Sequence, residues 1–281
     1  MYEEQYHGGR RQPHDELARA SRRRGDCGHR NPAYVVAART HRWPAVLTVT
    51  TRHAPTAILW DIDGTLLRAA GTGTRTFTIA LEIVTGLDFP TTPIDMGGRT
   101  DPDIATLVLE ALGIADDDVL HRLLREVERA YEQFEHEFRP LTVAKPGVAE
   151  VLDRLAAIDV VQTLVTGNLQ SIARRKVAAV GLDTHIRFEL GGYGSDHRLR
   201  SELVRTSCTR LAESGHAIAS ENTWVVGDTP RDLQCARDTG VRCVLVATGN
   251  HTYDELAPLG ADAVFTDLAD AEAFLELVLA G

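Results

Sequence analysis

"LWDIDGTLL", residues 59–67, is an apolar run that leads directly into two acids and then a glycine. The residues before the first acid have the composition of a buried strand. A carboxylate that leaves water is costly unless its charge is neutralised. Only one residue separates Asp61 from Asp63, so the two carboxylates need a bound cation, a shared proton or full exposure to solvent. Which of the three applies depends on what the rest of the chain supplies.

Similar short apolar runs recur later in the chain and alternate with helical patterns. The strand-like segments are 57–60, 160–165, 223–226, 242–246 and 263–265. The helical segments that lie between or after them are 148–155, 169–180, 200–214, 229–238 and 269–279. This alternation predicts an α/β fold, a doubly wound and Rossmann-like parallel sheet with helices on both faces.

The segment between the first strand and Gly147 breaks the alternation, because no good strand pattern occurs in it. Its three helical patterns lie near 74–86, 101–113 and 116–136. A structureless loop of this length would be unusual, so we expect an inserted helical lobe. We predict an α/β core over 56–70 and 143–281, and an α-helical cap domain over 71–142.

Residues 1–55 differ from the rest of the chain in charge. They hold ten arginines and five acids, whereas the whole chain has a formal net charge of −10. Their weak periodicity and scattered Gly and Pro favour a basic, disordered N-terminal extension, with a basic docking arm as the alternative. The negative net charge argues against a general affinity for nucleic acid or anionic membranes.

Cysteine usage and hydropathy set an expectation for the compartment. The sequence has no apolar run of about 18 residues, so it does not predict a membrane-spanning helix. The N-terminus lacks the pattern of a secretory signal. The four cysteines form no CxxC pair and have no metal-ligand spacing with histidine, which is typical of reduced thiols. We therefore expect a cytoplasmic monomer or homodimer that binds neither nucleic acid nor membrane.

Polar residues follow several predicted strands at their carboxyl ends. Asp61 and Asp63 follow the first, TGN at 166–168 follows the second, and GDTPRD at 227–232 follows a later one. Ligands of a doubly wound fold bind at this edge, so we expect the two aspartates to converge with Asp228. Mg²⁺ is the natural occupant, because it prefers a few carboxylates, waters and a substrate phosphate.

The three motifs also carry a family resemblance. DIDGT at 61–65, TGN at 166–168 and GDTPRD at 227–232 occur in the order found in the haloacid dehalogenase-like hydrolase superfamily, which residues 56–281 resemble. The insert resembles the small α-helical cap of its phosphoglycolate-phosphatase-like branch, most clearly in "GGRTDPDIATLVLEALGI" at 97–114. The resemblance implies Mg²⁺-dependent hydrolysis of a small phosphorylated metabolite.

The resemblance also implies a role for each motif residue. Asp61 is the expected nucleophile, because a carboxylate that forms an aspartyl-phosphate divides one difficult displacement into two. Asp63 would protonate the leaving alkoxide and then deprotonate the attacking water. The Thr166 hydroxyl would bind phosphoryl oxygens. The other residues expected to contact substrate are Gly64, Thr65, Gly167 and Asn168.

The same resemblance implies the metal contacts. They are the side chains of Asp61 and Asp228 and the backbone carbonyl of Asp63. Asp232 lies four residues after Asp228, at the start of a predicted helix. It would bind the metal directly, orient the metal's waters, or act only as an acid that stabilises the helix dipole.

A basic residue is the point at which the chain departs from the family pattern. Most relatives use a Lys between the second and last motifs, and the chain has only Lys145 and Lys176. We interpret Lys176, within the helix after TGN, as a packing and surface residue. "GGYGSDHRLR" at 191–200 resembles relatives in which Arg opens the next helix, which favours Arg200 over Arg198 for the catalytic role. A helix-start Arg has little packing to lose, so we expect its removal to leave the fold intact.

Substrate selection should depend on the cap. Arg99 is a candidate for binding a substrate carboxylate, as phosphoglycolate would offer, and a salt-bridging Arg at the start of a helix is the alternative. Thr100 and Asp101 are both candidates for the N-cap of the helix that follows.

Other functions fit the motifs less well. A phosphosugar mutase would share the core and the Asp pair. A non-catalytic binding protein that kept the fold would be expected to lose a motif residue. A true dehalogenase would need neither Asp63 nor Asp228.

Overall fold

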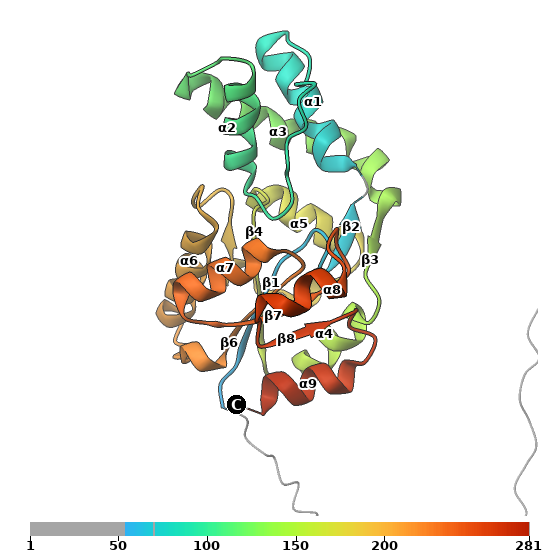
Figure 1. The fold of residues 1–281 in the computed structure, drawn as a ribbon, viewed down its shortest axis with the longest axis vertical. Helices are drawn as coiled ribbons and strands as arrows, with labels where there is room; N and C mark the ends of the chain where they lie inside the picture. Colours follow the sequence, from blue (N-terminus) through green and yellow to red (C-terminus); the bar gives the residue numbers. More distant parts are fainter. Residues whose placement is uncertain (1–53, 70, 281) are drawn as a thin grey trace, which may run out of the picture. The chain divides into compact units, whose positions relative to one another are not determined.

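The computed structural model describes residues 54–69 and 71–280 (Figure 1). Its main sheet has six parallel strands in the order β5-β4-β1-β6-β7-β8. The strands are β1 (Ala57–Trp60), β4 (Val161–Thr166), β5 (Gly192–Tyr193), β6 (Thr223–Gly227), β7 (Arg242–Val246) and β8 (Ala263–Phe265). The predicted parallel α/β fold is confirmed. The predicted extension over 1–55 lies outside the described residues, apart from Ala54 and Pro55.

Helices cover both faces of this sheet. They are α4 (Val148–Ala157), α5 (Gln170–Ala179), α6 (Arg200–Glu213), α7 (Pro230–Thr239), α8 (Tyr253–Leu256) and α9 (Ala271–Leu279). Successive residues of a strand point to opposite faces. Ile58 and Trp60 accordingly pack in one apolar cluster with residues of α4, α5 and α9, whereas Leu59 packs in another with residues of α6 and α7. This burial on both faces explains why the β1 sequence is a continuous apolar run.

A second, two-stranded sheet joins the core to the insert. Its strands β2 (Leu67–Ala69) and β3 (Thr142–Ala144) pair in antiparallel fashion. The expectation that no strand occurs between β1 and Gly147 is therefore wrong. Strands of three residues are too short to show a recognisable alternation, and they form here because they pair with each other.

The insert is a helical lobe of α1 (Thr72–Thr85), α2 (Asp101–Ala111) and α3 (Asp117–Phe138), called the cap below. The helices share an apolar cluster that includes Phe77, Val108 and Val127. Leu169 and Ile172 belong to the same cluster but come from the start of α5 and the residue before it. The cap therefore packs on the core immediately beside the TGN motif.

Across residues 54–69 and 71–280, no helix is both long enough and apolar enough to cross a bilayer.

Candidate active site

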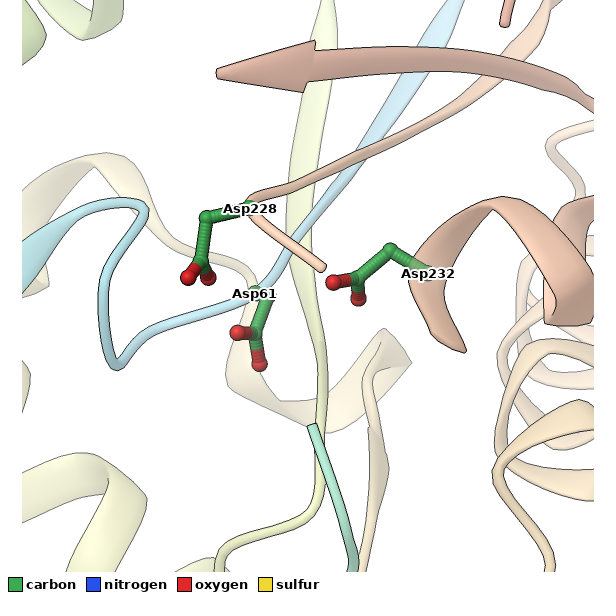
Figure 2. Close-up of side chains that lie close together, drawn as sticks. All are labelled: Asp61, Asp228 and Asp232. Carbon is green, nitrogen blue, oxygen red and sulfur yellow. The ribbon is translucent and has the colours of Figure 1, made fainter. Parts of the chain in front are cut away.

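The acidic residues predicted to converge lie at the carboxyl edge of neighbouring strands. Asp61 directly follows β1 and Asp228 directly follows β6, and these two strands pair with each other. Asp232 is in the first turn of α7, the helix that follows Asp228. Figure 2 shows the three side chains pointing toward one another. Each offers an oxygen within 4.8 Å of the others, and all three are buried.

This cluster carries more negative charge than a buried site tolerates without compensation. Burial, together with the charges of Asp61 and Asp232, raises the pKa of Asp228 to about 8. Burial likewise raises the pKa of Asp61 to about 6, although Arg200 opposes the shift. Of the three ways to neutralise the opening motif, full exposure is excluded for Asp61, because its exposed fraction is 4 %. A bound cation or bound protons must supply the balance.

Two glycines make room for the Asp228 carboxylate. A Cβ on Gly64 would lie 2.4 Å from Asp228 Oδ2, and one on Gly249 would lie 1.6 Å from the same oxygen. Gly64 also has a φ of +94°, a conformation that side chains rarely allow. The turn after Asp63 therefore needs glycine for two reasons. The backbone of Gly64 has a positive φ, and a side chain there would collide with Asp228.

Asp232 uses both of its oxygens within the protein. Its Oδ2 accepts hydrogen bonds from the backbone N–H (3.0 Å) and the hydroxyl (2.6 Å) of Thr229, and so closes the start of α7. Its Oδ1 accepts from Arg200. By contrast, Oδ2 of Asp61 and Oδ2 of Asp228 accept no hydrogen bond from any residue in the described ranges. These two oxygens are the ones that the cluster can offer to a divalent cation, and hard carboxylate oxygens fit such an ion.

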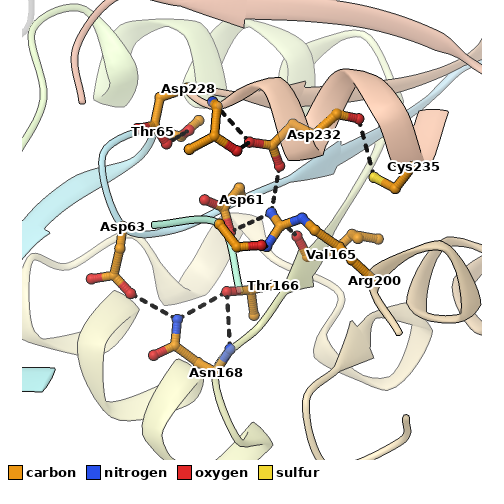
Figure 3. A network of polar contacts seen from close by, with 12 residues as sticks. Asp61, Asp63, Thr65, Val165, Thr166, Asn168, Arg200, Asp228, Asp232 and Cys235 are labelled. Carbon is orange, nitrogen blue, oxygen red and sulfur yellow. Dashed lines mark hydrogen bonds and ion pairs between the residues drawn. The ribbon is translucent and has the colours of Figure 1, made fainter. Parts of the chain in front are cut away.

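Arg200 is the basic residue that contacts the expected nucleophile. Its Nη2 lies 2.9 Å from Asp61 Oδ1 (Figure 3). Its Nη1 donates to the Gly98 carbonyl of the cap at 3.2 Å. Burial disfavours its charge, but Asp232 and Asp61 more than offset this and raise the pKa of Arg200 above its ordinary value. Arg198 instead pairs with Asp103 of the cap at 2.9 Å.

The expectation that Arg200 has little packing to lose is wrong. Its side chain is only 8 % exposed and lies between two buried carboxylates. A residue at the start of a helix is usually exposed, but here the helix begins at the strand edge where the cap covers it. Removing the guanidinium would leave Asp61 and Asp232 without their partner, so it would affect stability as well as chemistry.

The interpretation of Lys176 as a packing and surface residue is also wrong. Its side chain is 6 % exposed, and its Nζ lies 2.6 Å from Asp63 Oδ2 and 2.7 Å from Asn168 Oδ1. Side chains of a helix point back toward its N-terminus, and α5 begins beside the TGN motif. That geometry was the available signal, but which face of α5 meets Asp63 depends on tertiary packing.

Hydrogen bonds join the TGN motif to Asp63 (Figure 3). Asn168 Nδ2 donates to Asp63 Oδ2 at 2.8 Å and to Thr166 Oγ1 at 2.9 Å. Thr166 is fully buried. Thr65, from the first motif, donates its hydroxyl to Asp228 Oδ1 at 3.1 Å and so orients a carboxylate of the acidic cluster.

The first residue of α2 and the loop before it cover the TGN motif. The Asp101 N–H donates to the Gly167 carbonyl at 2.7 Å, and the Asp101 carboxylate accepts from the Leu169 N–H at 2.7 Å. A Cβ on Gly167 would lie 2.0 Å from the Arg99 carbonyl oxygen. Gly167 is therefore glycine because the backbone of the cap approaches it directly.

Arg99 is engaged within the cap. Its Nη1 lies 2.5 Å from Asp103 Oδ2 and its Nε donates to the Asp95 carbonyl at 2.8 Å. This is the geometry of the salt-bridging alternative, and the guanidinium is not free for a substrate carboxylate in this conformation. Thr100 is the N-cap of α2, since its hydroxyl accepts from the Asp103 N–H.

The chain thus combines a parallel α/β core, an inserted helical cap and a buried acidic cluster at the strand edge. The family model for haloacid dehalogenase-like hydrolase matches residues 58–237, which is more than half of the chain. The chain therefore belongs to the haloacid dehalogenase-like hydrolase family, and it is an enzyme of the hydrolase class.

Relatives within the family have similar sequences over most of their length. A phosphoglycolate phosphatase from Chromobacterium violaceum is 26% identical, over 76% of this chain and 93% of that protein. A phosphoglycolate phosphatase from Rhodospirillum rubrum is also 26% identical, over 76% of this chain and 88% of that protein. The predicted resemblance to the phosphoglycolate-phosphatase-like branch is confirmed.

Solved structures share the fold. A hydrolase from Pseudomonas syringae aligns with a TM-score of 0.59 and 21% identity, over 79% of this chain and 98% of that chain. A candidate beta-phosphoglucomutase from Bacteroides vulgatus aligns with a TM-score of 0.59 and 16% identity, over 82% of this chain and 91% of that chain. At these identities the likeness concerns the fold alone.

Proposed function

We propose that this enzyme is a Mg²⁺-dependent phosphatase that hydrolyses a small phosphomonoester through an aspartyl-phosphate on Asp61. The observation that carries the proposal is the position of Asp61. It is buried at the strand edge, held on one oxygen by Arg200, and free of hydrogen bonds from described residues on the other. The phosphatase names of the relatives support the same reaction class.

Asp61 is placed to act as the nucleophile. Its Oδ2 is the oxygen that it can offer to a metal ion, so Oδ1, which Arg200 orients at 2.9 Å, is the oxygen that would attack the phosphoryl group. The guanidinium would also contact the transferring group and steady the negative charge that builds there. Thr166, at the end of β4, and the backbone N–H groups that follow it would bind the phosphoryl oxygens.

The acidic cluster is suited to one Mg²⁺ ion. We infer that Asp61 Oδ2, Asp228 Oδ2 and the Asp63 backbone carbonyl would hold it, while Asp232 acts through Arg200 and the start of α7. When bound, the ion would neutralise part of the charge on the phosphate and on the nucleophile. The carboxylates of the cluster could then all be ionised at neutral pH.

A pH dependence of metal binding follows from the two raised pKa values. Asp61 and Asp228 hold protons up to about pH 6 and about pH 8 in the metal-free protein. Their pKa in the unfolded chain is about 3.9, so the folded state binds more protons between these values and their contribution to its stability falls as the pH rises. Mg²⁺ binds the deprotonated form, and its affinity therefore increases with pH.

The expected result is a thermal unfolding midpoint that Mg²⁺ raises more at about pH 8 than at about pH 6. Differential scanning calorimetry with and without Mg²⁺ measures it. Asp228→Asn is the matched control, in which Mg²⁺ should have little effect at either pH. An equal Mg²⁺ effect at both pH values in the unaltered protein would contradict the metal assignment.

Asp63 is suited to the acid–base step. Its side chain is 42 % exposed, and Asn168 and Lys176 both contact its Oδ2. In a single turnover, Asp63→Asn should therefore slow release of the alcohol from 2-phosphoglycolate, whose alkoxide needs a proton, by about 10²–10⁴. The first-turnover burst of p-nitrophenolate from p-nitrophenyl phosphate should fall much less, because p-nitrophenolate leaves without help, whereas hydrolysis of the aspartyl-phosphate should slow equally for both esters. Equal losses of first-turnover release on both esters would argue against an acid role.

The cap would enclose the substrate and exclude water during the reaction. Phosphoglycolate is the first substrate to test, on the names of the relatives. Arg99 does not support phosphoglycolate as the substrate in the conformation described, because its guanidinium is already paired with Asp103.

A screen for phosphate release tests the proposed function. Small phosphomonoesters, 2-phosphoglycolate among them, should release phosphate with Mg²⁺ and none with EDTA, and added Mg²⁺ should restore the activity. Full activity in EDTA would contradict the proposal. Formation of hexose 6-phosphate from hexose 1-phosphate, without free phosphate, would indicate a phosphosugar mutase instead.

A further inference from the structure

Lys176, in α5, is a buried cation that lies beside Asp63. Its Nζ is 2.6 Å from Asp63 Oδ2 and 2.7 Å from Asn168 Oδ1. The lysine side chain is 6 % exposed, whereas that of Asp63 is 42 % exposed. A buried ammonium is costly unless it is paired and hydrogen-bonded, and these two oxygens supply that compensation.

Lys176 determines which way the Asn168 amide faces. An ammonium group only donates hydrogen bonds, so the amide must present its oxygen to Nζ. The amide nitrogen then faces the other way, where it donates to Asp63 Oδ2 at 2.8 Å and to Thr166 Oγ1 at 2.9 Å. A single buried cation thus orders a chain of three polar side chains at the phosphoryl-binding loop.

The two donors converge on one oxygen of Asp63. Lys176 Nζ and Asn168 Nδ2 both bind Oδ2, and no donor among the described residues binds Oδ1. A half-exposed carboxylate rotates readily, but two hydrogen bonds to one oxygen, one of them charge-assisted, hold its plane. Oδ1 is then the oxygen left for a substrate.

We propose that Lys176 is a positioning residue for the acid–base step. It holds Asp63 Oδ2, directly and through Asn168, so that Asp63 Oδ1 meets the leaving-group oxygen in a fixed orientation. Two buried cations then have separate tasks: Arg200 orients the nucleophile Asp61, and Lys176 orients the acid Asp63. This inference rests on the proposed phosphatase function, since it assigns a task within that reaction.

Lys176→Met tests the inference, because it nearly keeps the length of the side chain and removes the charge and the donors. In a single turnover it should slow release of the alcohol from 2-phosphoglycolate by roughly 10–100-fold, part of the 10²–10⁴ that general acid–base catalysis contributes. The first-turnover release of p-nitrophenolate from p-nitrophenyl phosphate should stay within about threefold, because that leaving group needs no proton. A merely structural role for Lys176 would lower both rates alike. Lys176→Gln, which keeps polar atoms in the buried position, should show the same selective loss if the Met variant does not fold.

Arg174→Met is the matched control on the same helix. Its guanidinium lies over the Phe188 ring, 4.4 Å from the ring centroid, and its loss should leave both rates unchanged. The second arm combines Lys176→Met with Asp63→Asn. If Lys176 acts through Asp63, the double variant should hydrolyse 2-phosphoglycolate no more than about threefold more slowly than Asp63→Asn alone.

Two results would overturn the inference while leaving the phosphatase function in place. The first is an equal loss of rate on both esters in Lys176→Met. The second is a double variant whose loss of rate is the product of the losses of the two single variants. If the unaltered protein hydrolyses neither ester, the proposed function fails and the inference fails with it. The rates of the unaltered protein therefore separate the two failures.

Discussion

Asp61→Asn is expected to abolish hydrolysis, with kcat lower by roughly 10⁴-fold or more, as removal of a catalytic nucleophile typically costs. An amide in this position has no charge with which to attack a phosphoryl group. The substitution is nearly isosteric, and it removes an acid whose pKa burial has raised to about 6. The metal-free variant should therefore unfold at a temperature equal to or above that of the unaltered protein at neutral pH.

Steady-state kinetics and thermal unfolding, measured on the same preparation, check both parts of this prediction. Asp88→Asn is the control, because Asp88 is an exposed acid of the cap and its loss should change neither quantity. An Asp61→Asn variant that keeps a tenth or more of the activity would remove Asp61 from the nucleophile's role.

Arg200→Ala should lower kcat by about 10²–10³, because the lost cation steadies charge that builds in the transition state. It should also destabilise the metal-free protein by about 3–5 kcal/mol, since two buried carboxylates lose their partner. Arg200→Lys should recover part of both losses, although an ammonium has fewer donors to reach Asp61, Asp232 and the Gly98 carbonyl together.

Arg198→Ala is the comparison for Arg200. Its side chain is 49 % exposed and pairs with Asp103 at the surface, an interaction worth about 0–1 kcal/mol. Its kinetics and unfolding should remain near those of the unaltered protein. Loss of activity in Arg198→Ala together with normal activity in Arg200→Ala would show that the other arginine serves the nucleophile.

Much of the core was predictable because its signals are local. The β1 run is apolar at every position, since both faces of the strand are covered, and it ends where Asp61 reaches the strand edge. The rule that ligands bind at the carboxyl ends of parallel strands then brings Asp228 to the same place. Neither step needs knowledge of long-range packing.

The features that sequence reasoning missed all depend on tertiary contacts. The three-residue strands β2 and β3 are recognisable only as a pair. Lys176 is a surface residue by composition, and only the packing of α5 against Asp63 buries it. The burial of Arg200 likewise depends on the cap, through the Gly98 carbonyl. Contacts between segments far apart in the sequence leave no periodic signal.

Trapping the phosphoenzyme tests the central claim most directly. The enzyme is mixed with 2-phosphoglycolate or p-nitrophenyl phosphate and Mg²⁺, quenched in acid during turnover, digested and mapped by mass spectrometry. The account predicts one phosphoryl group on Asp61, absent when EDTA is present and absent in Asp61→Asn. Rapid turnover with no phosphoenzyme, or a phosphoryl group on any other residue, would contradict it.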